Sequence, residues 1–428
     1  MDDPSRRDFL ARAGGGLAAL ALTPGLVAFT GRSRAAAHAA RRSGGSGTVR
    51  VGVVGTGARG REALEAFAEL PAAEVVAICD EDPGRLKGGK RRAPDALATT
   101  DLAEMLEAAA GLEAVVLCTP THRHLEVLQP VLAAGLHVYC ETPLAHRRED
   151  AEAIVRLAAD SERVVAAGST ARANPLYTRT RGVTRTEATG RLLAAEVHAH
   201  RRTSWRQAAP DPAWEAKRNW RLDPEVSLGL PGEVLAHWFD YLLWTTGLEP
   251  VSVHGHGAVL AWRDGREVAD TVQLLVACAG GPAWNCEATL GNSFGDEEAR
   301  VHGTNGTVRA AESHAWLYKE SDAPTQGWEV YATRETHFRD EGLVLLANAT
   351  KLAAQEKLAA GAGQPHSPFW YALDDFLAAC LEGRKPACTP REAFPATILA
   401  QRAADALRSE GGAGLDGLLA PPASDAAR

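Results

Sequence analysis

The sequence lacks the cysteine and histidine spacings that bind metals or build disulfide frameworks. Its seven cysteines include no CxxC pair and no metal-ligand spacing. Cys79, Cys118 and Cys140 each end or follow an apolar, strand-like run, as small hydrophobic residues do. His254 and His256 alternate along another such run, with no third ligand nearby. We therefore predict that all seven cysteines are structural and that the chain has no metal site.

Basic charge is scarce outside the N-terminus. The chain of 428 residues has a net charge of −8, yet residues 1–47 contain seven Arg, no Lys and three Asp. The remainder therefore carries a net charge of about −12. Nucleic-acid binding requires a basic face that neutralises phosphates. The acidic body excludes nucleic acid as a partner.

Long apolar runs are also missing after residue 47, where no segment approaches the roughly 18 residues of a membrane span. The N-terminus carries the twin-arginine pattern Ser5-Arg6-Arg7-Asp8-Phe9-Leu10, then an uncharged stretch at 13–31 and small residues at 35–40. This order is typical of an export signal. We expect residues 1–47 to be a signal peptide and linker, and the mature protein to be periplasmic or extracellular without a membrane span. A lone membrane anchor is the alternative, which the glycines at 14–16 disfavour.

The rest of the chain predicts an α/β fold of two domains. Between residues 48 and 170, β-branched runs alternate with helical patterns, which is typical of a doubly wound parallel sheet of the Rossmann type. After residue 171 the pattern changes to long strand-like runs at 191–200, 251–259, 271–277 and 284–290. These runs predict an α+β domain with a large, mostly antiparallel open sheet over residues 171–415. Residues 416–428 are expected to be a flexible tail.

A dinucleotide motif directly follows the first predicted strand. Its residues are Gly55, Thr56, Gly57, Ala58, Arg59 and Gly60, in a GxGxxG spacing that opens the first helix. Gly55 permits a tight turn, Gly57 lets the diphosphate approach the backbone, and Gly60 lets the helix lie close to the strand. Asp80 follows the second strand, where a carboxylate binds a ribose diol and repels a 2′-phosphate. We predict NAD as the cofactor, and Arg59 keeps NADP possible.

Several further motifs, in order along the chain, resemble one family. They are Thr119-Pro120-Thr-His-Arg-His124, then Ala134-Gly135-Leu-His-Val-Tyr-Cys-Glu141-Thr142-Pro143-Leu144, then Gly168–Tyr177, Gly232–Gly247 and Val301–Thr307. The set resembles the glucose–fructose oxidoreductase, inositol dehydrogenase and MocA (Gfo/Idh/MocA) family over nearly all of the predicted mature chain. The family's usual EKP lysine is replaced here by Thr142, and its usual aspartate by Glu233.

The resemblance implies the roles of the site residues. Cofactor contacts are expected from Thr119, Pro120, His124, Glu141, Thr142 and Pro143, and substrate contacts from Arg172, Tyr177 and Trp220. The catalytic group is expected to comprise His237 as general base, Glu233 as the residue that orients it, and Asp240 on the same helical face. Without the motif, a histidine in such an apolar helix is an ordinary core residue. Trp205, Trp214, Arg218 and Lys217 lie in the stretch before this helix, and Lys217 is a candidate to replace the missing lysine.

Together these features predict an NAD(P)-dependent oxidoreductase that acts on a sugar, polyol or related cyclic hydroxy compound. Because no NAD pool is replenished outside the membrane, export predicts a tightly retained cofactor that works in a redox-neutral cycle. An NAD-dependent glycosidase that uses oxidation and elimination, or a non-catalytic sugar-binding relative, is the alternative, since Thr142 cannot supply the lysine's charge. A homo-oligomer is expected.

Overall fold

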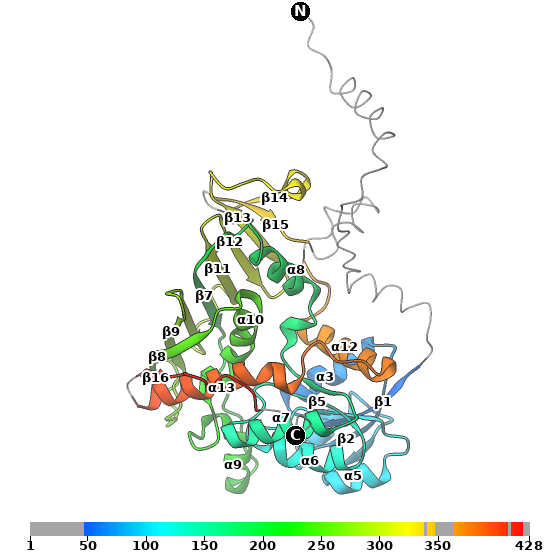
Figure 1. Ribbon diagram of the computed structural model, residues 1–428. Coiled ribbons are helices and arrows are strands. Elements are labelled where there is room, and N and C mark those ends of the chain that lie inside the picture. The colour runs from blue at the N-terminus through cyan, green and yellow to red at the C-terminus, as the bar shows by residue number, and fades with distance from the viewer. Residues whose placement is uncertain (1–46, 338–339, 347–362, 410–411, 423–428) are drawn as a thin grey trace, which may run out of the picture. The chain divides into compact units, whose positions relative to one another are not determined.

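The computed structural model describes residues 47–337, 340–346, 363–409 and 412–422. Nearly all of the predicted signal segment 1–47 lies outside these residues, as do residues 423–428 of the predicted tail. Two sheets dominate the described chain, one parallel and one mostly antiparallel (Figure 1). This arrangement confirms the predicted α/β fold class.

The first sheet has six parallel strands in the order β3-β2-β1-β4-β5-β6. Its strands are β1 (Val49–Val54), β2 (Ala73–Cys79), β3 (Leu97–Thr99), β4 (Ala114–Leu117), β5 (His137–Cys140) and β6 (Val165–Ala167). The valines of β1 and β4 are buried, as expected when helices cover both faces of a parallel sheet. The order reverses direction between β1 and β4, where ligands bind in open α/β sheets.

Helices on both faces complete this Rossmann unit. They are α3 (Ala58–Glu69), α4 (Pro83–Lys90), α5 (Leu102–Ala108), α6 (His124–Ala133) and α7 (Arg148–Asp160). The start of α4 is encoded locally, because Asp82 accepts hydrogen bonds from the amides of Gly84 and Arg85 and Pro83 is the first helical residue.

The second sheet has ten strands in the order β14-β15-β13-β12-β11-β7-β10-β9-β8-β16. They are β7 (Leu192–His200), β8 (Pro250–Ala258), β9 (Thr271–Cys278), β10 (Ala283–Thr289), β11 (Glu297–Gly303), β12 (Gly306–Ala311), β13 (Ala315–Lys319), β14 (Arg334–His337), β15 (Asp340–Val344) and β16 (Gly412–Gly414). All neighbours pair antiparallel except β7 and β10, which are parallel.

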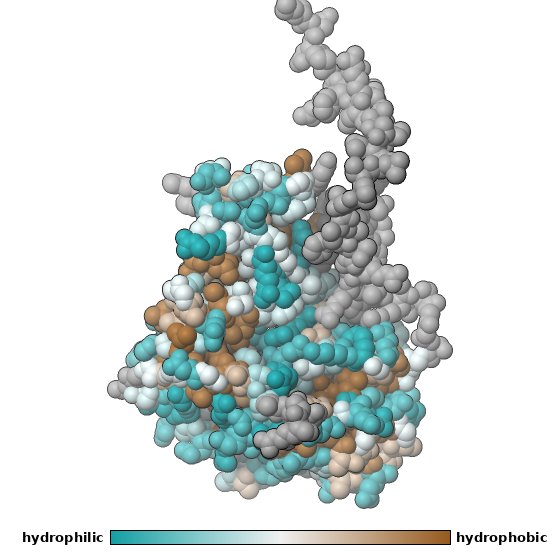
Figure 2. All heavy atoms as spheres, viewed as in Figure 1, coloured by the Kyte–Doolittle hydropathy of each residue, from teal (hydrophilic) through white to brown (hydrophobic). Residues whose placement is uncertain are grey.

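One face of this sheet is covered by helices, and in β7 buried side chains alternate with partly buried ones. Helices α8 (Pro175–Thr184), α10 (Ala236–Thr246) and α13 (Pro390–Arg408) contribute to one core with the sheet. In β7, Ala195, Val197 and Ala199 point into that core, whereas the residues between them are only partly buried. At the edge that carries β8 and β9, apolar residues reach the surface (Figure 2), including Leu275.

Two C-terminal helices pack against the Rossmann unit, and one of them also joins the core of the second sheet. Helix α12 (Pro368–Glu382) packs on α3 and β1 of the Rossmann unit, with Phe369, Leu373 and Phe376 in its core (Figure 1). Helix α13 contributes to the cores of both sheets. The two sheets lie on either side of residue 170, where we predicted the domain boundary. The helices do not follow this boundary, because α12 lies within 171–415 but packs in the Rossmann core.

The segment 416–422 is not free of the body, contrary to our expectation of a flexible tail. Leu418 and Leu419 are partly buried against the Rossmann core. The carbonyl of Leu418 accepts a hydrogen bond of 2.9 Å from Arg148. Apolar contact explains why this part of the predicted tail is placed. Within the described residues, no helix is long and apolar enough to cross a membrane.

We expect Leu377→Ala to destabilise the protein strongly, because Leu377 of α12 is fully buried in the Rossmann core. A buried Leu→Ala change costs about 2–5 kcal/mol in the free energy of unfolding. Leu381→Ala is the matched control, since Leu381 lies one turn later in the same helix and is 45% exposed. Urea unfolding of the two variants measures the difference. Equal losses would contradict the placement of α12 in the Rossmann core.

Candidate functional site

The turn between β1 and α3 has the geometry of an anion-binding loop. Gly55 has a φ of +90°, which favours glycine, and a Cβ there would lie 2.6 Å from the carbonyl oxygen of Cys118. At Gly60 a Cβ would lie 1.8 Å from the carbonyl oxygen of Gly55, so α3 lies closer to the strand than a side chain permits. Beside Gly57, in contrast, nothing lies within 4 Å of such an atom. The backbone at the start of α3 is therefore open to a diphosphate.

Asp80 follows β2 and faces this loop. Its carboxylate accepts hydrogen bonds from the amide of Thr56 at 2.7 Å and from the amide of Asp82 at 2.9 Å. Burial raises the pKa of Asp80, and these hydrogen bonds oppose the rise. The hydroxyl of Thr56 also donates to this carboxylate at 3.2 Å, so about one of its roughly four acceptor positions remains for a ribose hydroxyl.

A cavity of about 380 Å³ adjoins the loop and holds most of the predicted cofactor residues of the Rossmann unit. Its Rossmann lining includes Gly55, Gly57, Ala58, Arg59, Asp80, Thr119 and Pro120. The rest of its wall comes from residues 207–221 of the second domain, with Gln207, Trp214, Lys217, Arg218, Trp220 and Arg221. The residues of the loop and of this second wall fit a dinucleotide, which needs free amides, a carboxylate and enclosing side chains.

The segment 203–221, which we call the strap, is fixed to the Rossmann unit by ion pairs. It contains α9 (Pro212–Arg218). Arg218 lies 2.6 Å from Asp82, and burial and the Arg218 hydrogen bond act oppositely on the pKa of Asp82, with a net lowering. Lys217 lies 2.9 Å from Glu81. Lys217 is therefore bound at the end of β2, and the structure does not place it beside Thr142 as a substitute for the lysine.

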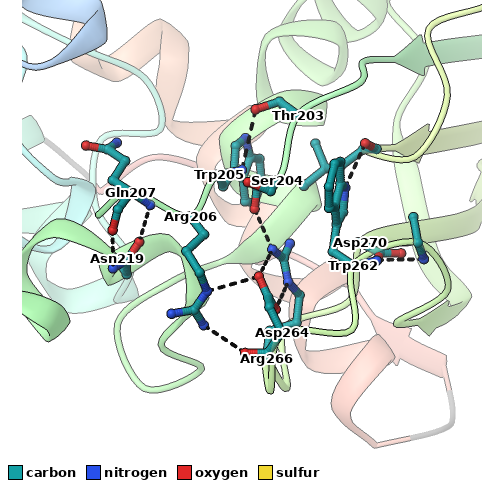
Figure 3. Close-up of polar contacts among 12 residues, drawn as sticks. Thr203, Ser204, Trp205, Arg206, Gln207, Asn219, Trp262, Asp264, Arg266 and Asp270 are labelled. Carbon is teal, nitrogen blue, oxygen red and sulfur yellow. Dashed lines mark hydrogen bonds and ion pairs between the residues drawn. The ribbon is translucent and has the colours of Figure 1, made fainter. Parts of the chain in front are cut away.

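The other end of the strap is fixed to its own domain (Figure 3). The buried guanidinium of Arg266 donates to the carbonyl of Ser204 at 2.5 Å and to Asp264, which also accepts from Arg206 at 3.0 Å. Gln207 and Asn219 exchange two hydrogen bonds across the strap. The strap is thus attached both to the Rossmann unit and to its own domain.

Arg59 is committed to carboxylates rather than available for a 2′-phosphate. Its Nε lies 2.7 Å from buried Glu141, its Nη1 lies 2.9 Å from Glu62, and its guanidinium stacks 3.5 Å above the ring of Phe369. Burial raises the pKa of Glu141 while Arg59 opposes that rise. These contacts therefore weaken the argument that Arg59 could bind the 2′-phosphate of NADP.

Glu233 was expected to orient His237, but its contacts are elsewhere. The residue lies in a π-helical turn, Pro231–Leu235, directly before α10. One carboxylate oxygen accepts from the hydroxyl of Thr121 at 3.0 Å and the other from Arg221 at 2.7 Å. The guanidinium of Arg221 lies 4.6 Å from the ring centre of Trp220. Thr121 and Arg221 were missed from the sequence, because nothing local marks a partner for either residue.

His237 is in the first turn of α10 and has a buried Nδ1 with no hydrogen-bond partner among the described residues. Burial lowers the pKa of His237 to about 3, and the positive charges of Arg59 and Arg201 act in the same direction. The imidazole is therefore neutral near pH 7. An unsatisfied buried nitrogen is costly unless a ligand completes its hydrogen bond.

Asp240 and two predicted substrate residues have structural partners. The Asp240 carboxylate is fully buried and forms a two-pronged ion pair with Arg172, whose closest contact is 2.8 Å. Arg172 also donates to the carbonyl of Glu392 at the start of α13. Tyr177 is buried in the second core against Trp238 and Tyr241. These contacts make the residues packing and charge partners within the fold, and their catalytic and substrate contacts stay predictions.

The remaining predicted cofactor residues surround the ends of β4 and β5. His124 is buried, and its two ring nitrogens lie 3.1 Å from the carbonyls of Thr119 and Leu144, so it links the two loops. Thr142 is nearly buried, its hydroxyl lies 3.4 Å from that of Ser169, and the bond to Pro143 is cis. Trp220 is nearly buried at the cavity wall, 5.7 Å from the ring of His122.

Comparison with known families agrees with this geometry. Residues 49–169 match the oxidoreductase family with an NAD-binding Rossmann fold, and residues 177–309 match the GFO/IDH/MocA C-terminal domain. The chain belongs to the Gfo/Idh/MocA oxidoreductase family. The predicted oxidoreductase class and NAD-binding Rossmann domain are thereby confirmed, and the family domains lie on the two sheets described above.

The individual proteins that resemble the chain have low sequence identity to it. An inositol 2-dehydrogenase of Saccharopolyspora erythraea is 29% identical over 345 residues, which cover 79% of this chain and 94% of the relative. A glycosyl hydrolase family 109 protein of Solibacter usitatus is 31% identical over 174 residues, or 38% of each chain. Among solved structures, a levoglucosan dehydrogenase in complex with NADH and L-sorbose has a TM-score of 0.67 at 19% identity, covering 86% of this chain and 99% of that one.

We expect two glycine substitutions in the loop to impair different properties, one NAD binding and the other the stability of the fold. Gly57→Ala should leave folding intact, because the added methyl group meets open space at a φ of −63°, but it should weaken NAD binding at least tenfold by obstructing the diphosphate. Gly60→Ala should destabilise the fold, because its methyl group meets the backbone of Gly55. Thermal unfolding and calorimetry with NAD separate the two effects. Unchanged NAD affinity in Gly57→Ala would contradict the assignment of the loop.

Proposed function

We propose that this family member oxidises a carbinol group of a sugar, polyol or related cyclic hydroxy compound, with NAD as the hydride acceptor. Support comes from the NAD-binding family domain and from the inositol 2-dehydrogenase that resembles the chain over most of its length. The cavity between Rossmann unit and strap would hold the cofactor through the Gly57 backbone and Asp80.

His237 is the proposed proton acceptor. Its imidazole is neutral, and its buried Nδ1 has no hydrogen-bond partner within the described chain. A substrate hydroxyl placed there would satisfy the nitrogen and could transfer its proton as the hydride leaves. Arg221, held between Glu233 and Trp220 at the cavity wall, is the proposed source of the positive charge that Thr142 does not supply.

We also propose that the cofactor is tightly retained, because the strap closes over the cavity that would hold it. Residues on both sides of the cavity are joined by the Arg218–Asp82 ion pair, in which the carboxylate is almost completely buried. A dinucleotide enclosed there would leave only when the strap separates from the end of β2. Slow release suits a redox-neutral cycle, in which the same cofactor molecule is reduced and reoxidised in place.

The twin-arginine pattern supports export of the protein. Export in turn favours a retained cofactor, because an exported enzyme has no replenished NAD pool. We therefore propose a periplasmic or extracellular location. A homo-oligomer remains a prediction.

A second candidate function is glycoside cleavage through transient oxidation and elimination. The observation that favours it is the relative named as a family 109 glycosyl hydrolase, together with Thr142 in place of the usual lysine. A transient reduced cofactor with release of an aglycone distinguishes this activity from simple dehydrogenation, and ligand binding without any redox signal indicates a binding protein. Absorbance of reduced nicotinamide during addition of polyols, sugars and aryl glycosides tests all three.

We expect Arg218→Ala to accelerate NAD dissociation about tenfold or more, because it removes the partner of a nearly buried carboxylate. Lys217→Ala is the matched control from the same helix. Its ion pair with Glu81 is about half exposed on both sides, and such pairs contribute little. Stopped-flow displacement of bound NAD, and the nucleotide content of the purified proteins, measure retention. Similar dissociation rates for the two variants would show that the strap does not hold the cofactor.

His237→Gln should lower turnover by about 10²–10⁴-fold while NAD binding stays within a factor of three of the parent. The pKa of His237, lowered to about 3, also predicts that its protonation does not reduce kcat/KM between pH 8 and pH 5. Initial rates across this range test both statements. A variant with nearly full activity would remove His237 from the mechanism, whereas an acid limb near pH 6.5 that belongs to His237 would contradict its lowered pKa.

A further inference from the structure

Contrary to our prediction from the sequence that there is no metal site, we propose that the chain binds a divalent transition-metal ion on the open face of the ten-stranded sheet, through His198, His200 and Glu287. One ligand atom from each residue lies within 4.8 Å of the other two. This is the single group of this kind within the described residues. None of the three residues lines the dinucleotide cavity, so the site is separate from the proposed oxidoreductase centre.

The sheet itself brings these residues together. Strands β7 and β10 are parallel neighbours, and their register sets Glu287 beside His198. Because side chains alternate along a strand, His198 and His200 share one face. Their neighbours Val197 and Ala199 point into the helix-covered core, so the histidines project from the opposite face. The convergence is thus fixed by backbone pairing rather than by a flexible loop.

The Glu287 carboxylate lies so close to two imidazole nitrogens that a positive charge between them would stabilise the arrangement. One carboxylate oxygen of Glu287 lies 2.8 Å from Nδ1 of His198 and 2.8 Å from Nε2 of His200. His200 Nδ1 lies 2.8 Å from the carbonyl of Phe294, which can only accept, so the ring proton resides on Nδ1. A neutral His200 then directs the Nε2 lone pair at a carboxylate oxygen. Either an added proton or a metal ion must lie between them.

His200 has the outer hydrogen-bond partner that metal-binding histidines usually have, and His198 has a carboxylate nearby. His200 donates through Nδ1 to the Phe294 carbonyl, and His198 Nε2 faces a carboxylate oxygen of Glu196 at 3.6 Å. Glu196 lies between His198, His302 and Arg300, with contacts of 3.4 to 3.8 Å. The Arg300 charge is offset by Glu196 and by Glu298, with which it also forms an ion pair.

The donor set indicates the kind of ion. Two imidazole nitrogens and one carboxylate oxygen suit Zn²⁺ and related divalent metals, whereas Ca²⁺ and Mg²⁺ prefer all-oxygen sites. Bonds of about 2.0–2.1 Å in tetrahedral geometry separate ligand atoms by roughly 3.3 Å. The two contacts of 2.8 Å would have to widen by roughly 0.5 Å, which these partly exposed side chains can do by rotation. The fourth position is left for water.

Binding of Zn²⁺ to the full chain tests the proposal. After removal of metals by chelator, titration calorimetry at pH 7.5 should show one Zn²⁺ per chain, and Co²⁺ should give the intense visible bands of a four-coordinate site. Because imidazole must be neutral to bind, affinity should fall below about pH 6. His198→Gln and Glu287→Gln should each weaken Zn²⁺ binding at least tenfold.

His256→Gln is the matched control, since His256 is an exposed histidine on β8 of the same sheet and belongs to no such group. It should bind Zn²⁺ like the parent. Glu196→Gln removes only an outer partner and should weaken Zn²⁺ binding about tenfold. This variant keeps all three ligands, so it tests the site even if a ligand variant fails to fold. Absence of stoichiometric Zn²⁺ binding, or equal losses in His256→Gln and His198→Gln, would overturn the proposal. Bound NAD in each variant reports the fold independently.

Discussion

The close approach of α3 to the end of β1 is the constraint on which the site depends. It exists only because Gly55 and Gly60 have no side chains, since a Cβ on Gly60 would overlap the Gly55 carbonyl. Bringing the helix this near directs its free amides and the positive end of its dipole into the cavity. The same approach sets Arg59, in the first turn, against Glu141 at the end of β5. One backbone contact therefore forms the anion site and positions the charges around it.

Buried ion pairs then fix the elements around this turn. Arg59 and Glu141 join α3 to β5, whereas Arg172 and Asp240 join the chain after β6 to α10. A buried pair contributes little net stability compared with apolar packing, but an unpaired partner is costly. Such pairs therefore specify which elements meet. Asp240, which the family motif marks in the sequence, takes part in such a pair.

The sequence predicted what depends on local patterning. Strand periodicity, the GxGxxG spacing and the family motifs were enough to predict both sheets and the loop that faces the cavity. Contacts between distant segments could not be predicted in this way. Glu233 was paired with His237 through the family resemblance, but Thr121 and Arg221 are its partners, and Glu233 lies in a π-helical turn. Likewise, α12 has an ordinary amphipathic pattern, and only packing selects the Rossmann core as its partner.

The strap connects this architecture to the chemistry. Its far end is anchored to the second domain through Arg266 and Asp264, and its near end to the Rossmann unit through Arg218 and Asp82. Since Arg218 and Asp82 both line the cavity, separating the strap from the Rossmann unit there breaks a nearly buried ion pair. Affinity differences between related complexes arise mainly in dissociation rates. In the function proposed above, the strap acts on this rate, because its ion pair with Asp82 must break before an enclosed cofactor leaves.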